Sequence, residues 1–129
     1  MKIKAISLNK KRDNRGWLIE NESNIVKDSM RHFLVSVSKS GSIRGQHYHK
    51  NKREWLIVIK GKAEVIFEDI KTKESARVVV SGEDPKIIET VPFVAHAFRN
   101  IGKDDMYLVA IVNEPLDQKN PDTYPYEVK

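Results

Sequence analysis

The stretch GSIRGQHYHKNKREWLIVIKG, residues 41–61, holds two candidate strands joined by a short basic turn. Because side chains alternate faces along a strand, His47 and His49 point to one face and Tyr48 points to the other. Glu54 opens the second strand and can face the same interior. Gly61 ends that strand at a tight turn, which needs a residue tolerant of positive φ. The stretch therefore predicts a polar cluster beside the basic turn and a hairpin at Gly61.

A distant strand adds a further histidine to this cluster. His96 and Asn100 are four positions apart, so they share one strand face. Together, His47, His49, Glu54 and His96 offer three imidazoles and one carboxylate, which suit Zn, Mn, Fe, Ni or Cu. We expect these four residues to bind a divalent transition metal, with Zn favoured and Mn, Ni or Fe as alternatives. The other interpretation is a metal-free site that transfers protons.

The composition bounds the class of protein. A length of 129 residues predicts one domain, residues 1–129. With no cysteine, the chain has no disulfide, thiol nucleophile or thiolate metal site. The start, MKIKAISLNKKRDNR, is charged, and no apolar run reaches membrane-spanning length. We therefore expect a cytoplasmic protein without a membrane partner.

The charge favours an anionic partner. The net charge of +5 comes from 23 basic and 18 acidic residues. These basic residues are scattered, and no helix-turn-helix, zinc-finger or aromatic RNA-binding motif accompanies them. A phosphate-bearing small molecule is thus expected rather than nucleic acid. The six glycines nowhere form G-x-G-x-x-G, so the sequence has no dinucleotide-binding motif of its own.

Short β-like runs separated by turn signals fill most of the chain. Many short strands at even spacing predict an antiparallel barrel or jelly roll. The last segment, residues 115–129, is polar and proline-rich, so we expect it to be irregular. The expected strands are residues 3–8, 17–20, 32–38, 42–49, 55–60, 63–67, 76–80, 86–90, 97–100 and 106–113.

Several motifs resemble the sugar-nucleotide branch of the cupins, over nearly the full length. RGQHYH, residues 44–49, resembles the strand RG-x-H-x-H of nucleotide-sugar epimerases. DNRGWL, residues 13–18, resembles the opening of dTDP-4-dehydrorhamnose 3,5-epimerase. The tail, with Asn113, Glu114 and NPDTYP at 120–125, resembles the C-terminal cupin domain of bifunctional capsular-polysaccharide enzymes. Those enzymes epimerise a UDP-4-keto-6-deoxy amino sugar at C3 in the cupin and reduce it in a separate Rossmann domain.

The resemblance implies a fold and a function. The fold is all-β, a cupin double-stranded β-helix or jelly-roll barrel in a single domain. The function is metal-dependent epimerisation of a nucleotide-linked 4-keto-6-deoxy sugar, at C3 or at C3 and C5, in cell-surface polysaccharide biosynthesis. The alternatives are a nucleotide-sugar 3,4-ketoisomerase, a non-catalytic sugar-binding cupin and a cupin dioxygenase. His49 places the chain with the metal-binding members, whereas Val91 and Phe93 stand where the family's second motif has proline and glycine.

The resemblance also assigns roles to individual residues. His47 is the base of a metal-free site, and His96 is catalytic beside it. If the cluster holds a metal, the base must come from elsewhere or from water on the metal. Tyr48 is a candidate acid although strand alternation turns it away, with Tyr107 and Tyr124 as alternatives.

Further residues are expected to bind the nucleotide-diphosphate sugar: Arg15, Arg44 and Asn100. Arg44 is three residues before His47, so it reaches the same side only if a bulge intervenes. Lys52, on the basic turn, and His32, outside the motifs, are expected to be solvated or structural.

Oligomers are expected for two reasons. The strand from Trp55 to Lys60 is apolar on both faces, so a second sheet or a partner should cover its outside. Related cupins form dimers with exchanged N-terminal strands, and Arg15 resembles an arginine that reaches the neighbouring subunit's nucleotide. We therefore expect a homodimer, working with a separate reductase.

Overall fold

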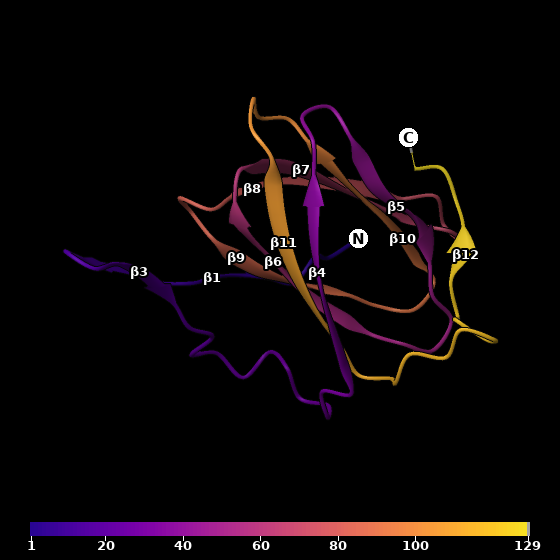
Figure 1. Cartoon of the computed structure of the whole chain (residues 1–129). Helices are drawn as coiled ribbons and strands as arrows, with labels where there is room; N and C mark the ends of the chain where they lie inside the picture. Colours follow the sequence, from indigo (N-terminus) through magenta and orange to yellow (C-terminus); the bar gives the residue numbers. More distant parts are fainter. Residues whose placement is uncertain (129) are drawn as a thin grey trace.

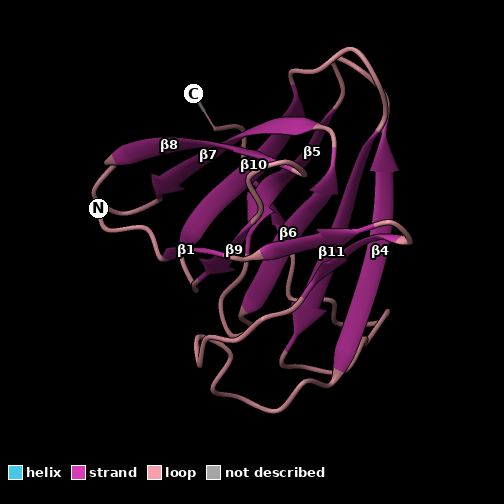
Figure 2. Ribbon diagram, turned by 90° about the vertical axis from the view of Figure 1, so that its left-hand side faces the viewer, coloured by secondary structure: helices cyan, strands magenta, loops and turns pink. Residues whose placement is uncertain are grey.

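Two five-stranded antiparallel sheets face each other in the computed structural model, which describes residues 1–128 (Figures 1 and 2). The first sheet has the order β1 (Ala5–Ser7), β9 (Lys86–Thr90), β6 (Glu54–Lys60), β11 (Met106–Val112) and β4 (His32–Ser38). The second has the order β12 (Tyr124–Pro125), β5 (Ile43–Tyr48), β10 (Val94–Asn100), β7 (Lys62–Asp69) and β8 (Ser75–Ser81). A separate hairpin of β2 (Lys10–Asp13) and β3 (Gly16–Ile19) projects from the barrel (Figure 1).

The all-β fold expected from the sequence is confirmed, and β4 and β9 have the expected bounds. Two strands were missed. β2 reads KKRD, which lacks the apolar alternation that marks a strand. β12 contradicts the expected irregular tail: Tyr124 pairs with Tyr48 at the edge of the second sheet. Lys129, the last residue of that expected segment, lies outside the described residues.

Strand alternation builds the core between the sheets. In β11, buried residues alternate strictly with half-buried ones, because every second side chain points inward. Gly61 makes the turn from β6 to β7 with φ +90, and a Cβ there would lie 2.9 Å from Met106 Cα. The hairpin expected here is wrong, because β6 belongs to the first sheet and β7 to the second. The core between the sheets consists of Leu56, Val58, Ala63, Val65, Phe67, Val80, Ile88, Phe98, Met106, Leu108 and Ala110.

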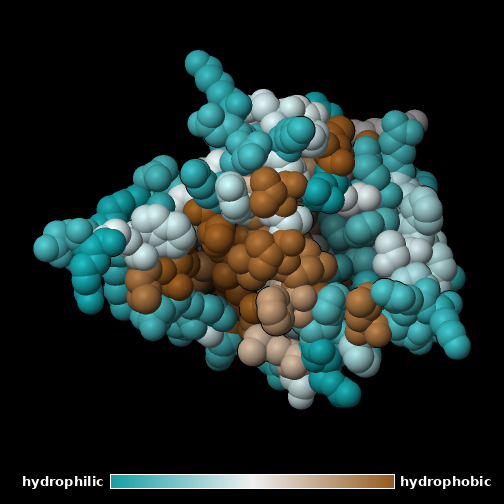
Figure 3. Space-filling model, viewed as in Figure 1, coloured by the Kyte–Doolittle hydropathy of each residue, from teal (hydrophilic) through white to brown (hydrophobic). Residues whose placement is uncertain are grey.

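The outer face of the first sheet is covered over one half only. Trp55 and Ile87 pack there against Leu8 and Ile25. The cover expected from a second sheet or a partner is therefore supplied at Trp55 by the chain's own N-terminal segment. Farther along, at β4 and β11, the outer face is open: Phe33 is 71% exposed, and Figure 3 shows a broad hydrophobic area in this view.

Within residues 1–128, no helix is long and apolar enough to cross a membrane.

Candidate metal centre

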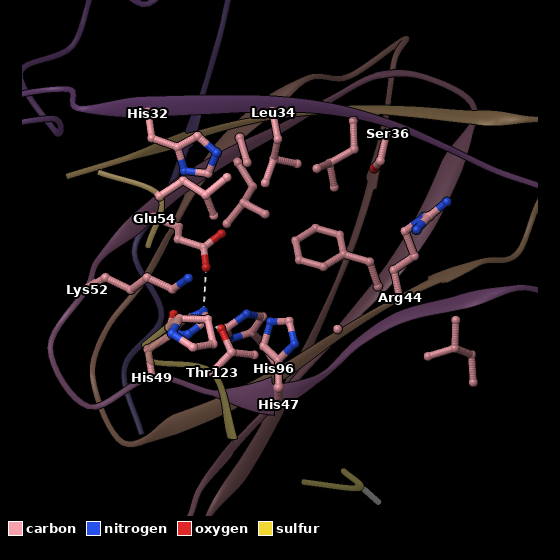
Figure 4. A pocket seen from close by; sticks show the side chains of 18 of the residues that line it. His32, Leu34, Ser36, Arg44, His47, His49, Lys52, Glu54, His96 and Thr123 are labelled. Atoms are coloured by element: carbon pink, nitrogen blue, oxygen red, sulfur yellow. Dashed lines mark hydrogen bonds and ion pairs between the residues drawn. The ribbon is translucent and has the colours of Figure 1, made fainter. Parts of the chain in front are cut away.

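Four side chains meet at one end of the barrel interior. His47 lies at the end of β5 and pairs directly with His96 on β10. The His47 ring centroid is 4.7 Å from that of His96 and 4.9 Å from that of His49. Glu54, the first residue of β6, completes the group, and the ligand atoms of all four lie within 4.8 Å of one another. Figure 4 shows these side chains converging.

Burial sets the charge of this cluster. Burial, with a smaller effect from His49, lowers the pKa of His47 to about 4. Burial likewise lowers the pKa of His96 to about 3. For Glu54, burial alone would raise the pKa, but contact with His49 and the neighbouring His96 and Lys52 lower it to about 2. At neutral pH the cluster therefore offers uncharged rings of His47 and His96 and an ionised carboxylate.

His49 has one ring nitrogen without a directed partner. Its Nδ1 lies 2.8 Å from the main-chain oxygen of Asp122. Because that oxygen can only accept, Nδ1 carries a proton, and in the neutral ring Nε2 then keeps its lone pair. Nε2 contacts the Glu54 carboxylate but is buried without a hydrogen-bond partner. A nitrogen lone pair that faces a carboxylate oxygen is suited to bind a cation between them. His49 and Glu54 are therefore suited to hold a transition metal.

A cavity of about 450 Å³ opens from the cluster, within the usual range for small-molecule sites. Part of its wall is apolar and comes from the barrel core, including Leu56, Phe98 and Leu108. Leu116, Pro121 and Thr123 from the C-terminal segment line it as well. The cavity therefore combines a polar end with apolar walls.

A bulge in β5 brings Arg44 to the cavity. The pairing of β5 with β10 shifts register between His96 and Ala97, and Gly45 and Gln46 have φ of +92 and +54. A Cβ on Gly45 would lie 2.6 Å from the main-chain oxygen of His96, so only glycine fits. Arg44 consequently lines the cavity. Its Nε donates to Ser38 Oγ at 2.8 Å, and its Nη2 donates to the main-chain oxygen of Val37 at 2.9 Å.

The structure corrects the expected role of Asn100, which is buried and does not line the cavity. Its Nδ2 donates to the main-chain oxygens of Ser38 at 2.9 Å and Asp104 at 2.8 Å. Its Oδ1 accepts from the Gly102 N–H at 2.9 Å. With these hydrogen bonds made to backbone, Asn100 shapes the loop before β11 instead of binding substrate.

Two further expected residues lie away from the cavity within one chain. Tyr48 faces the outside of the second sheet, where its ring stacks on Tyr124 at 5.3 Å, so it cannot supply the acid inside. Arg15 is on the projecting hairpin, with its side chain 87% exposed and paired with Asp13. The Arg15 side chain can meet a nucleotide only if another subunit brings one to it.

Sequence reasoning missed two residues that line the cavity, His32 and Lys52. His32 begins β4, and Leu34 and Ser36 face inward with it; this period of two was the available signal. Lys52 was expected to be solvated, but it is half-buried and its ammonium points toward Glu54 (Figure 4). Turn residues carry no periodicity, so nothing local marked its direction.

Comparisons with known proteins place the chain in a family. Residues 11–124 match the family model described as the polysaccharide biosynthesis C-terminal domain. The chain belongs to this family. Over 92 residues, 71% of this chain, it is 43% identical to a Pseudomonas aeruginosa protein named UDP-2-acetamido-2,6-beta-L-arabino-hexul-4-ose reductase. The match covers 25% of that protein, so the chain spans about a quarter of the length of this relative.

Solved structures agree with this family assignment. The capsular polysaccharide assembling protein CapF from Staphylococcus aureus superposes with a TM-score of 0.75 at 31% identity, over 94% of this chain and 34% of that chain. A dTDP-4-dehydrorhamnose 3,5-epimerase from Bacillus anthracis superposes with a TM-score of 0.78 at 20% identity, over 94% and 76% of the two chains. At that identity the likeness concerns the fold alone, and it confirms the expected cupin barrel.

Proposed function

We propose that this chain is a metal-dependent epimerase domain for a nucleotide-linked 4-keto-6-deoxy sugar, in cell-surface polysaccharide biosynthesis. The observation that carries the proposal is the set of four ligand-type side chains within 4.8 Å at the wall of a 450 Å³ cavity. The Pseudomonas aeruginosa relative supports the substrate class, since its name describes a UDP-linked sugar with a ketone at C4.

The chemistry of such a sugar matches the cluster. Hydrogens on C3 and C5 are acidic because the carbanion left behind delocalises into the C4 carbonyl. When bound, a divalent transition metal stabilises the resulting enolate oxygen as a Lewis acid, an effect of several kcal/mol. Three nitrogens and one carboxylate oxygen suit Zn, with Mn, Ni and Fe as alternatives that geometry rather than affinity selects.

Proton transfer then requires groups outside the ligand set. Among the described residues, the other titratable groups that line the cavity are His32, Arg44 and Lys52. His32 lies on β4 of the first sheet, whereas His47 and His96 lie on strands of the second. Because imidazole is well matched to proton transfer near neutral pH, His32 takes the proton from C3. The proton returns to the other face from the cluster side, where Lys52 is the titratable group outside the ligand set.

The charged residues of the cavity fit an anionic substrate. Lys52 points toward Glu54, near where negative charge develops on the sugar (Figure 4). Arg44 lies on the far side of the same view, and a guanidinium suits the oxygens of a diphosphate (Figure 4). The sugar ring then lies near the cluster and the diphosphate near Arg44.

Two partners are part of the proposal, a reductase and a second copy of the chain. Reduction of the 4-keto sugar needs a hydride donor, and residues 1–129 carry no G-x-G-x-x-G, so a reductase outside these residues takes that step. A second copy of the chain covers the exposed outer face of β4, where Phe33 and Val35 are 71% and 59% exposed. In this homodimer, Arg15 reaches the partner's nucleotide.

The activity test is hydrogen exchange in deuterated water with UDP- and dTDP-4-keto-6-deoxyhexoses. Deuterium at C3 alone is the expected result, and deuterium at C3 and C5 indicates a 3,5-epimerase. A carbonyl moved to C3 indicates a 3,4-ketoisomerase, and no exchange by a folded, metal-loaded protein favours a binding role. His32→Gln should abolish exchange and retain the metal, whereas His47→Ala should lose the metal as well.

The dimer has its own test. Chains carrying Arg15→Ala are mixed with chains carrying His47→Ala, and each mixed dimer then contains one site with both native residues. Recovery of activity from two defective parents supports a shared site. A monomer in sedimentation analysis, or no recovery in mixed dimers, contradicts it.

A further inference from the structure

Asp122 makes four hydrogen bonds to the segment that carries the metal ligands. Its carboxylate accepts from the main-chain N–H of Lys50, Asn51 and Lys52, each at 2.9 Å. Its main-chain oxygen accepts from His49 Nδ1 at 2.8 Å. One residue of the C-terminal segment therefore holds both a cluster histidine and the turn between β5 and β6.

The backbone of Asp122 is specialised for this contact. Its φ is +51, a left-handed conformation that costs most L-residues about 1–2 kcal/mol and that Asp and Asn tolerate best. On both sides the chain is fixed: Pro121 and Thr123 line the cavity, and Tyr124 pairs with Tyr48. The direction of the Asp122 carbonyl is thus determined by its surroundings.

The charge of Asp122 is stabilised by the same contacts. Burial alone would raise the pKa of its carboxyl, but the hydrogen bonds from Lys50, Lys52 and Asn51 outweigh it and hold the pKa below its ordinary value. An ionised carboxylate accepting three N–H groups holds the turn firmly. The same turn carries Lys52 toward the cavity.

We infer that Asp122 is a positioning residue of the metal centre, which fixes His49 in the tautomer that presents Nε2 and holds Lys52 at the cavity. The inference rests on the proposed metal-dependent function. Partners of metal-ligating histidines orient the ring and raise its basicity, and losing one commonly weakens metal binding 10–100-fold. The C-terminal segment, although remote in sequence, then controls how tightly the site binds its ion.

The test compares variants that separate the backbone from the carboxylate. Asp122→Gly keeps access to positive φ but removes the three acceptor contacts. Asp122→Asn keeps one oxygen. The control is Asp117→Ala, because Asp117 makes similar turn bonds, to the N–H of Lys119 at 3.1 Å and of Asn120 at 3.3 Å, and does not line the cavity.

Affinity for Zn²⁺ is measured by chelator competition on the full chain, and the visible spectrum of the Co²⁺ form reports ligand geometry. Asp122→Gly should bind at least 10-fold more weakly with an altered spectrum, Asp122→Asn should fall between it and the native protein, and Asp117→Ala should match the native protein. Native affinity and spectrum in Asp122→Gly would overturn the inference.

A second readout separates this inference from the function on which it rests. In the metal-free protein, nitrogen-15 NMR identifies the protonated ring nitrogen of His49. It should be Nδ1 in the native chain and a mixture of tautomers in Asp122→Gly, which keeps the main-chain oxygen but loses the carboxylate contacts that hold it against His49. A native protein that binds no metal overturns the proposed function, and this spectrum still decides the role of Asp122. The same Nδ1 tautomer in all variants counts against it.

Discussion

The main-chain N–H of Phe93 donates to the main-chain oxygen of His49 at 2.8 Å. This hydrogen bond joins the loop before His96 to the end of the segment that carries His47 and His49. Phe93 makes this bond with φ +66, in the left-handed region. Related cupins have glycine at this position of the motif, so an aromatic residue here adopts a backbone shape that favours glycine.

Replacing Phe93 measures that backbone cost. Phe93→Gly and Phe93→Ala both lose the ring, which stacks on Tyr48 at 6.4 Å and lies 4.4 Å from Lys71 Nζ. Only alanine keeps the strain at φ +66, although glycine has more freedom when unfolded. The glycine variant should therefore be more stable by about 0.5–1 kcal/mol in denaturant unfolding. An alanine variant of equal or greater stability contradicts the strain.

Acid should destabilise the metal-free protein. The pKa of His47 falls from 6.5 to about 4 and that of His96 from 6.5 to about 3 in the fold. Below pH 6.5 the unfolded chain therefore binds protons that the folded chain does not. The unfolding free energy consequently decreases as the pH is lowered, until the pH is below the folded pKa values. Glu54, lowered from 4.5 to about 2, extends the loss downward. Thermal unfolding between pH 8 and pH 4 measures this slope, and His96→Gln should flatten it. A flat native profile contradicts the lowered values.

Gly45→Ala should damage the fold and the centre together. Its Cβ would lie 2.6 Å from the main-chain oxygen of His96, at φ +92. We expect a loss of about 2 kcal/mol or more in unfolding free energy, with weaker Zn²⁺ binding. Gly16→Ala is the matched control, since Gly16 also has positive φ, +135, but nothing within 4 Å of the added Cβ. Equal losses in the two variants would assign the effect to backbone strain alone.

Arg44→Ala should weaken nucleotide binding by about 1.5–3 kcal/mol, the usual worth of hydrogen bonds to charged groups. Metal content should stay constant, because Arg44 is not among the four clustered ligand residues. Calorimetric titration with UDP and dTDP measures the change, and elemental analysis checks the metal. Arg15→Ala should show a similar loss only in a dimer. Unchanged nucleotide affinity in Arg44→Ala would mean that the Arg44 guanidinium only makes its hydrogen bonds to Ser38 and Val37 and does not bind the diphosphate.

Local spacing explains which parts of the molecule could be predicted. His47 and His49 share a face by strand alternation, and Glu54 opens the next strand after a short turn, so the cluster could be predicted. The position of Arg44 depends on a bulge with positive φ at Gln46, which is not a glycine and so gives no signal. Asn100 was misassigned for the converse reason: its spacing from His96 is regular, but its amide is hydrogen-bonded to the backbone of Ser38, Asp104 and Gly102.

The C-terminal segment shows a different limit. Its prolines and polar residues indicate a chain without regular structure, and most of it follows that rule. Asp122 and Tyr124 nevertheless bind to β5 and the turn after it, more than 70 residues earlier. Contacts of such sequence separation leave no periodic pattern, so only the folded arrangement reveals them.

The cluster draws its ligands from both sheets: His47 and His96 lie on strands of the second and Glu54 on a strand of the first. An ion held by all of them cross-links the two layers, and global unfolding must release it. By mass action, free ion at 100 times its dissociation constant adds about 2.7 kcal/mol to the unfolding free energy. Melting temperatures recorded with one metal at a time thus rank the metals by affinity, without any sugar substrate.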